Sequence, residues 1–538
     1  MFRFTATSTL ALILGAAPVL ADVTPAQVWE NLQEYGTEYG YQVTGDVEDA
    51  GNTLTVTDAV FSMPGETGNS TITLPKMTFQ ETGDARVRVV IDGDVAVDSS
   101  FMAPVPQEEE TTEAAPDAGA DAPADPAAPD EAPEMVEMTM TGTIRMPGNE
   151  MVVSGMPEDM LYEFTYPTLE FDFDLPTEPG QDVTIPVTGS VTDLAGSQRN
   201  VAAADGGMNT TFDMKAAKAA MQIEAQMPAD DAGVGGGTVD FQVALTDLTS
   251  QGTGKTPGQS FDLGTQLAEA LAAGLVLETT LTYETLQGSF DVTGKDENGQ
   301  DQSGKGSFST GATDIAFQMS EQGLGYKAAT ADAAAEMTLA TLPFPISYGV
   351  ERIGAEMLIP VSQAEAAQPF KFVYALEDLT FGDAIWNLFD PTSQLPRDPA
   401  SLTVDLSGDA VVSQDLFDPA QAQPQTDAVP EAPFMPKTLN VNRIALDAVG
   451  ATADITGSLE FGDNPNEPVG QLTGSFEGVN GLMDKLVAMG LVPQEQMMGM
   501  RMMLAMFAKP AEGNPDRLTS EIEFREGGQI FANGQQVK

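Results

Sequence analysis

The chain has 538 residues, with 81 acidic and 23 basic side chains, a formal net charge of −58, and neither histidine nor cysteine. Such an acidic chain repels phosphate backbones, so we expect no nucleic-acid partner. The missing residue types exclude Ser-His-Asp and Cys-His catalysis and zinc held by histidine or cysteine. We therefore predict that the protein is not an enzyme and has no catalytic residue, no cofactor and no metal site.

The first residues have the pattern of an export signal. Arg3 precedes an apolar run over residues 10–17, and Val19-Leu20-Ala21 has the side chains that signal peptidase requires at its cleavage site. The run is shorter than the roughly 20 apolar residues that span a bilayer. We predict residues 1–21 to be a signal peptide cleaved after Ala21. The mature chain should then be periplasmic, with no transmembrane segment.

Two segments have the composition of disordered chain. Residues 103–134 contain Ala-Pro-Asp repeats with no lysine or arginine, and residues 418–436 are rich in Gln, Ala and Pro. Neither segment can bury enough apolar surface to offset its conformational entropy. Because strand-like sequence flanks both, we predict disordered loops inside two β-rich regions, 22–345 and 346–538.

Apolar and polar residues alternate along several segments of the chain. The alternation is clear over residues 87–91, 138–146 and 169–175. A period of two predicts antiparallel strands with one apolar face and one polar face. Such an apolar face must be covered by a second sheet, by helices or by a ligand.

Helices are few in the sequence pattern. Thr24-Pro25 has the residue types of a helix start. Short helices are expected at residues 263–273 and 383–388, and a C-terminal helical pair at residues 480–508.

The strand–helix–strand order recurs three times, and residues 244–249 and 375–380 are nearly alike. We therefore predict a mainly β (α+β) fold. Its antiparallel sheets should be curved and elongated, built from duplicated strand–helix–strand modules with short capping helices.

The second predicted helix of the C-terminal pair is rich in methionine. Its methionines include a series at three-residue spacing: Met497, Met500, Met503 and Met506. Thioethers bind Cu(I), but this spacing also indicates a core stripe, and methionine fills irregular apolar gaps. We treat the four residues as a candidate apolar contact face, either buried in a core or facing a groove.

Four segments carry a resemblance to a known family. Residues 22–29, 395–402, 518–524 and 531–535 resemble an uncharacterised bacterial family, domain of unknown function 2125. The resemblance spans nearly the whole mature chain and implies an exported protein of Gram-negative bacteria with no assigned activity. The strand–helix–strand units are also similar in architecture to AsmA-like envelope proteins, which are β-rich grooves implicated in lipid handling. We expect this chain to lack the N-terminal membrane anchor that is usual in those proteins.

Together, these features predict a non-catalytic envelope protein that binds an apolar ligand, a lipid, or a partner protein of the envelope on a curved β-sheet. One alternative is a structural or assembly factor of the periplasm with no small ligand. A more distant alternative is a glycan hydrolase that uses a pair of carboxylates. The alternatives differ in whether the apolar face of the sheet is an open groove or a closed core.

Overall fold

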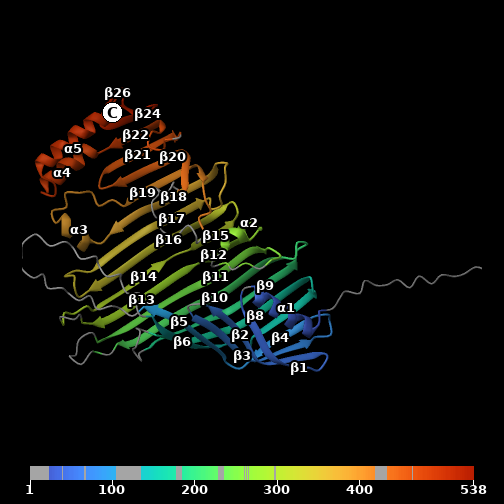
Figure 1. Cartoon of the computed structure of the whole chain (residues 1–538). Helices are drawn as coiled ribbons and strands as arrows, with labels where there is room; N and C mark the ends of the chain where they lie inside the picture. The colour runs from blue at the N-terminus through green and yellow to red at the C-terminus, as the bar shows by residue number, and fades with distance from the viewer. Residues whose placement is uncertain are drawn as a thin grey trace, which may run out of the picture.

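The computed structural model describes residues 23–538 except for residues 39, 66–67, 105–134, 177–183, 228, 230–235, 260, 262, 264–265, 296–298, 418–432 and 463. The predicted signal peptide and its cleavage at Ala21 lie outside the described residues. So does most of the two predicted disordered loops. In the described residues the chain is strand-rich, with one large antiparallel sheet and five helices, so the predicted mainly β class is confirmed (Figure 1).

The strands follow one another across the sheet almost in chain order. The first half of the sheet consists of β1 (Gln42–Asp49), β2 (Thr53–Gly65), β3 (Gly68–Glu81), β4 (Val87–Asp92), β5 (Val95–Pro104), β6 (Met135–Arg145), β7 (Glu150–Met156), β8 (Asp159–Pro176), β9 (Thr184–Ala202), β10 (Met208–Met227), β11 (Gly237–Thr256), β12 (Val276–Tyr283) and β13 (Thr285–Gly294).

The second half consists of β14 (Gly304–Thr310), β15 (Thr313–Ser320), β16 (Gly323–Leu339), β17 (Ile346–Ile359), β18 (Gln368–Phe381), β19 (Ala400–Val412), β20 (Phe434–Ala448), β21 (Ala451–Glu460), β22 (Val469–Glu477), β23 (Lys509–Ala511), β24 (Asn514–Arg525), β25 (Gln529–Ala532) and β26 (Gln535–Gln536). The predicted boundary between two β-rich regions, at residues 345 and 346, falls between β16 and β17. These two strands pair directly in the same sheet.

The helices are α1 (Pro25–Glu38), α2 (Leu267–Ala272), α3 (Asp383–Phe389), α4 (Val479–Ala488) and α5 (Gln494–Phe507). The predicted helix start at Thr24 is confirmed as a reciprocal cap. The Gln27 backbone N–H donates to the Thr24 hydroxyl at 3.3 Å, and the Thr24 N–H donates to the Gln27 side-chain oxygen at 3.0 Å. The predicted C-terminal helical pair is also confirmed, as α4 and α5.

Three predicted boundaries were wrong. The helix expected from Leu263 begins only at Leu267, because Leu263 lies in a turn and Gln266, the N-cap residue, has a non-helical backbone conformation. The loop predicted from Ala103 begins later, since Ala103 continues the ladder opposite Val136. The loop predicted to end at residue 436 ends earlier, because β20 is already paired with β19 from Phe434 onward.

One apolar face runs across the whole sheet. The pairing registers place residues from β2 to β24 in a single transverse row, and most of them are apolar. The row reads Leu54, Phe79, Val89, Met151, Phe164, Gly196, Met214, Ser250, Leu281, Ile315, Ala328, Ala355, Tyr374, Val404, Ile444, Ile455, Gly474 and Ser520. We call this side of the sheet the apolar face and the opposite side the polar face.

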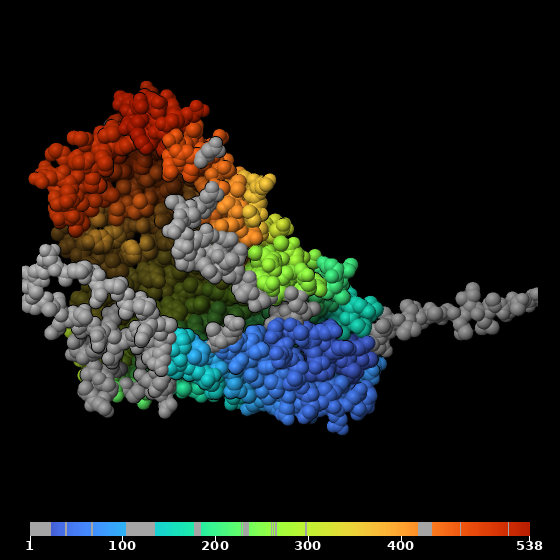
Figure 2. Space-filling model, in the orientation of Figure 1, coloured from blue at the N-terminus to red at the C-terminus, as the bar shows by residue number. Residues whose placement is uncertain are grey.

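At the N-terminal end the sheet curls around α1. Val28 and Trp29 of α1 are buried against apolar-face residues such as Phe79, whose ring meets that of Trp29 edge-on at 6.0 Å. On the far side of α1, the Tyr162 hydroxyl of β8 donates to the side-chain oxygen of Asn31 at 2.5 Å. The apolar face therefore points into the curl, and Figure 2 shows the hollow on this side between the N-terminal strands in blue and the C-terminal helices in red.

A line of residues in the left-handed conformation crosses the sheet. Five mid-strand aspartates on β2, β9, β11, β16 and β18 adopt the left-handed conformation, with φ between 49° and 54°: Asp58, Asp193, Asp247, Asp332 and Asp378. At Asp247 the partner strand is interrupted too, because Thr246 pairs with Thr285 of β13 whereas Thr249 pairs with Thr282 of β12. Aspartate tolerates this conformation better than most residues do. We call this feature the bulge line.

Candidate functional site

The apolar face is exposed in the middle of the sheet. Five register partners on β15 to β19 form what we call the central apolar row: Phe317, Tyr326, Met357, Phe372 and Leu406. Tyr326 is 39% exposed and Phe372 is 46% exposed. Large side chains of the same face are exposed nearby as well, namely Leu277, Tyr348, Phe381 and Leu446. Exposed apolar patches of this kind mark binding surfaces in soluble proteins.

Helix α2 covers one margin of this surface. Its buried Ala270 and Leu271 pack with Met319 and Leu324, which pair with each other at the end of β15 and β16 on the apolar face. A recess of about 190 Å³ lies beside the helix, lined in part by Leu275, Leu277 and Met319. The exposed apolar surface therefore continues into a small apolar recess.

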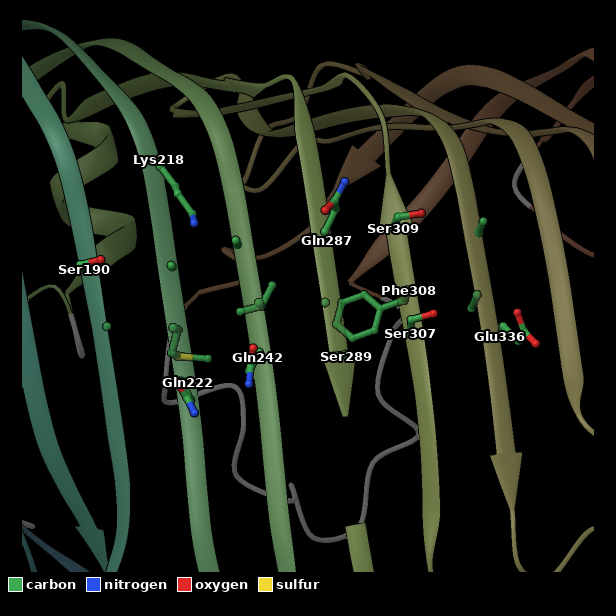
Figure 3. A pocket seen from close by; sticks show the side chains of 18 of the residues that line it. Ser190, Lys218, Gln222, Gln242, Gln287, Ser289, Ser307, Phe308, Ser309 and Glu336 are labelled. Carbon is green, nitrogen blue, oxygen red and sulfur yellow. The ribbon is translucent and has the colours of Figure 1, made fainter. Parts of the chain in front are cut away.

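The polar face carries a wider, open depression of about 930 Å³ (Figure 3). Its polar lining comes from neighbouring strands between β9 and β16: Ser190, Lys218, Gln222, Gln242, Gln287, Ser289, Ser307, Ser309 and Glu336. Phe308, labelled in the same view, belongs by register to the apolar face, where its ring lies over Gly288. The depression offers mainly uncharged hydrogen-bonding groups, and Lys218 and Glu336 are its charged side chains.

The bulge line brings carboxylates together on β16 to β18. The pKa of Glu351 in β17 is raised by a hydrogen bond with Asp378 and by repulsion from Asp378, with smaller contributions from burial and from Asp332 and Glu377. Both Glu351 and Asp378 are exposed at the surface. This geometry differs from the enclosed carboxylate pair that glycan hydrolysis needs. Among the described residues, no group of three or more acidic side chains is placed to hold a metal ion.

A buried aspartate organises the loop after α3. The Asp390 carboxylate, inaccessible to solvent, accepts hydrogen bonds from the backbone N–H groups of Gln394 and Leu395, both at 2.8 Å. Burial by itself raises the pKa of Asp390, but these bonds and the nearby Arg397 charge outweigh it, so the net shift is downward. The Arg397 guanidinium also lies 5.6 Å from the centre of the Trp386 ring. This cluster, which includes part of the segment at 395–402, has a structural role.

The structure separates the four methionines of the candidate contact face. Met497 is 3% exposed, whereas Met500, Met503 and Met506 are 45–59% exposed. A three-residue step falls short of a full helical turn, so successive members of the series rotate around α5.

The sequence analysis did not identify the central apolar row. The pattern that could have revealed it is the alternation of aromatic residues in β18, at Phe370, Phe372 and Tyr374.

These observations define the class of protein. It is a mainly β protein whose single antiparallel sheet curls at one end and leaves an apolar face exposed in its middle. No described helix is both long enough and apolar enough to cross a membrane.

The family follows from a match of residues 289–532 to the model described as "Uncharacterized protein conserved in bacteria (DUF2125)". The match supports this family for that part of the chain. The match is shorter than the resemblance expected from the sequence, but it contains the central apolar row and both C-terminal helices. No curated protein and no solved structure matches the chain, and the similarity to AsmA-like proteins is not confirmed.

Proposed function

We propose that the protein is a non-catalytic, exported envelope protein that binds a lipid along the apolar face of its sheet. The observation that carries this proposal is the exposure of Tyr326 and Phe372 in the middle of a face that is otherwise apolar from β2 to β24. Burying such side chains against acyl chains is favourable by about 25 cal/mol per Å² of apolar area removed from water. At the N-terminal end α1 already covers this face, which leaves the centre for a ligand.

The alternatives are supported less well. A structural factor with no ligand would bury its apolar faces internally, whereas Tyr326 and Phe372 are exposed. A glycan hydrolase would need two carboxylates flanking a cleft. The neighbouring carboxyl groups of Glu351 and Asp378 instead lie exposed on the bulge line.

Lipid mass spectrometry tests the proposal. The protein is purified from the periplasm of its source cells and extracted with organic solvent. We expect a stoichiometric lipid from the wild type and its loss from the double variant Tyr326→Asp, Phe372→Asp. The matched control is Thr282→Asp, Thr403→Asp, which adds the same charge on the polar face of β12 and β19 and should keep the lipid. Circular dichroism verifies that both variants fold.

A wild-type extract without lipid would reject the ligand and turn attention to protein partners, which crosslinking would then identify. N-terminal sequencing of the same preparation tests export. We expect a mature chain that begins at Asp22, whereas an uncleaved chain would reject the predicted signal peptide.

A further inference from the structure

The small recess beside helix α2 lies at one margin of the apolar face (Figure 1). The sheet forms one of its walls, where Gly254 of β11 pairs with Leu277 of β12 and Leu277 pairs with Met319 of β15. Ala270 of α2 and the nearby Leu275 line it as well, and both are buried. The recess is therefore apolar on its sheet side and on its helix side.

A glycine keeps this recess open. Gly254 has no positive φ, and a Cβ atom on it would lie 3.9 Å from its nearest neighbours, the Thr210 Cβ and the Val276 carbonyl oxygen. Two residues earlier on the same face the space is already filled, because a Cβ on Gly252 would lie 2.5 Å from the Phe212 ring. The apolar face is thus filled at Gly252 and open at Gly254.

The charges around the recess favour an uncharged occupant. Among the described residues that line it, Lys255 is the charged one, and its ammonium group is paired with Asp205 at 3.5 Å. A carboxylate or phosphate group that entered would lose water without gaining a free cation, which is costly. An alkyl group has no such cost. The lining therefore favours the end of an acyl chain over a charged headgroup.

The size and the position of the recess fit the end of one chain. Its volume of about 190 Å³ exceeds the roughly 150 Å³ of an apolar protein cavity that takes up one benzene ring. Leu277, which is 37% exposed, connects it with Phe317 and Tyr326 of the central apolar row. Tyr326 and Leu277 are two strands and two residues apart, or about 12 Å. A chain that lies across the two aromatic rings can thus reach the recess with its end.

We propose that the recess binds the terminal carbons of one acyl chain, while the carbons nearer the headgroup lie on Phe317 and Tyr326. The inference rests on the proposed lipid-binding function and adds selection by chain length. A chain too short to reach the recess lacks this contact, and the far wall limits the longest chain. Each methylene that enters should tighten binding about fourfold, because it leaves water for an apolar surface.

Displacement of a neutral fluorescent probe tests this proposal. N-phenylnaphthylamine is bound to the mature chain and displaced by octanol, dodecanol or tetradecanol, which are single-chain ligands without charge. We expect the affinity of the wild type to increase with chain length. Gly254→Leu fills the recess and should weaken tetradecanol binding at least roughly tenfold, because several methylenes lose their apolar contact. Octanol should change by less than about threefold, since a short chain still fits on the aromatic rings.

Two further variants complete the experiment. Gly254→Ala adds a single methyl group with no neighbour closer than 3.9 Å, and it should cause an intermediate loss. Gly354→Leu in β17 is the matched control and should behave like the wild type. A Cβ on Gly354 would also have no neighbour closer than 3.9 Å, but Gly354 lies on the polar face, next to Ala355 of the transverse row. Circular dichroism verifies that each variant folds.

The outcomes separate this inference from the proposed function. Displacement curves that are the same for the wild type and the two Gly254 variants would overturn the recess as a chain-end site, but they would leave the sheet as a lipid site. An equal loss from Gly354→Leu would overturn it too, because the effect would not come from the recess. If none of the alcohols displaced the probe from the wild type, both the inference and the proposed function would be rejected.

Discussion

The carboxyl group of Glu351 in β17 shares a hydrogen bond with that of Asp378 in β18, and this contact raises the pKa of Glu351. The contact results from the bulge line. Asp378 adopts φ 54° in the middle of its strand, and β17 pairs with β18 on both sides of this point. Residues that tolerate the left-handed conformation are often aspartates, so a line of bulges also becomes a line of negative charge.

Replacing Glu351 should stabilise the protein at neutral pH. Because the folded-state pKa of Glu351 is raised, its ionised form destabilises the native state above that pKa, and the penalty disappears as the pH falls and Glu351 becomes protonated. We expect Glu351→Gln to have a higher urea midpoint than the wild type at pH 7, and the difference to shrink in acid. Glu321→Gln, in the turn between β15 and β16, is the control. An equal gain from both variants would disprove the specific contact.

The left-handed aspartates make a conformational prediction. Asp247 has φ 51°, a region that asparagine also tolerates and that a β-branched residue does not. Asp247→Val should lower the free energy of unfolding by roughly 1–2 kcal/mol, while Asp247→Asn should change it little. Denaturant unfolding of the two variants compares them directly. Equal stability of the two would argue against strain at this bulge.

Asp390 should make the α3 loop sensitive to acid. Its pKa is lowered in the folded state, so its contribution to stability is present above the ordinary value of 3.8 and is lost as the pH falls through the folded-state pKa. Asp390→Asn should be less stable than the wild type at neutral pH and should approach it in strong acid. Fluorescence of Trp386 in a Trp29→Phe background reports this loop during thermal unfolding. Parallel curves for both proteins at all pH values would contradict the prediction.

Core and surface residues of the same apolar face should respond differently to truncation. Phe79 is fully buried against Trp29, and Phe79→Ala should cost about 3–5 kcal/mol. Phe372→Ala in the exposed centre should change stability by no more than about 0.5 kcal/mol. Denaturant unfolding followed by circular dichroism measures both. A large loss from Phe372→Ala would show that the central apolar row is a core rather than a binding surface.

The local elements could be predicted from the sequence because their signals are local. Alternation over residues 169–175 falls within β8, and the cap at Thr24 uses a residue pattern that reaches only to Gln27. The near-identity of residues 244–249 and 375–380 also has a local cause, since Asp247 and Asp378 both adopt the left-handed conformation. The bulge at Asp378, however, was not recognised, because an aspartate between apolar residues also fits an ordinary strand.

The arrangement of the sheet and the exposure of the candidate site could not be predicted. Whether Tyr326 and Phe372 are covered depends on which elements approach β16 and β18, and alternation along one strand is the same in a closed core and in an open groove. The methionine series shows a second limit. Residue spacing did not reveal that Met497 packs inward while Met506 faces solvent, because the direction in which α5 packs is set by contacts distant in sequence.

The near-sequential pairing of the strands has a consequence for unfolding. Because most strands contact only the strands beside them in the chain, the sheet is close to a one-dimensional array, and its stability is approximately a sum of nearest-neighbour interfaces. Such an array can open progressively from a weak end rather than all at once. The short strands β25 and β26 form one end, while α1 secures the other. The rate at which backbone amide hydrogens exchange with solvent should therefore increase across the sheet towards its C-terminal margin.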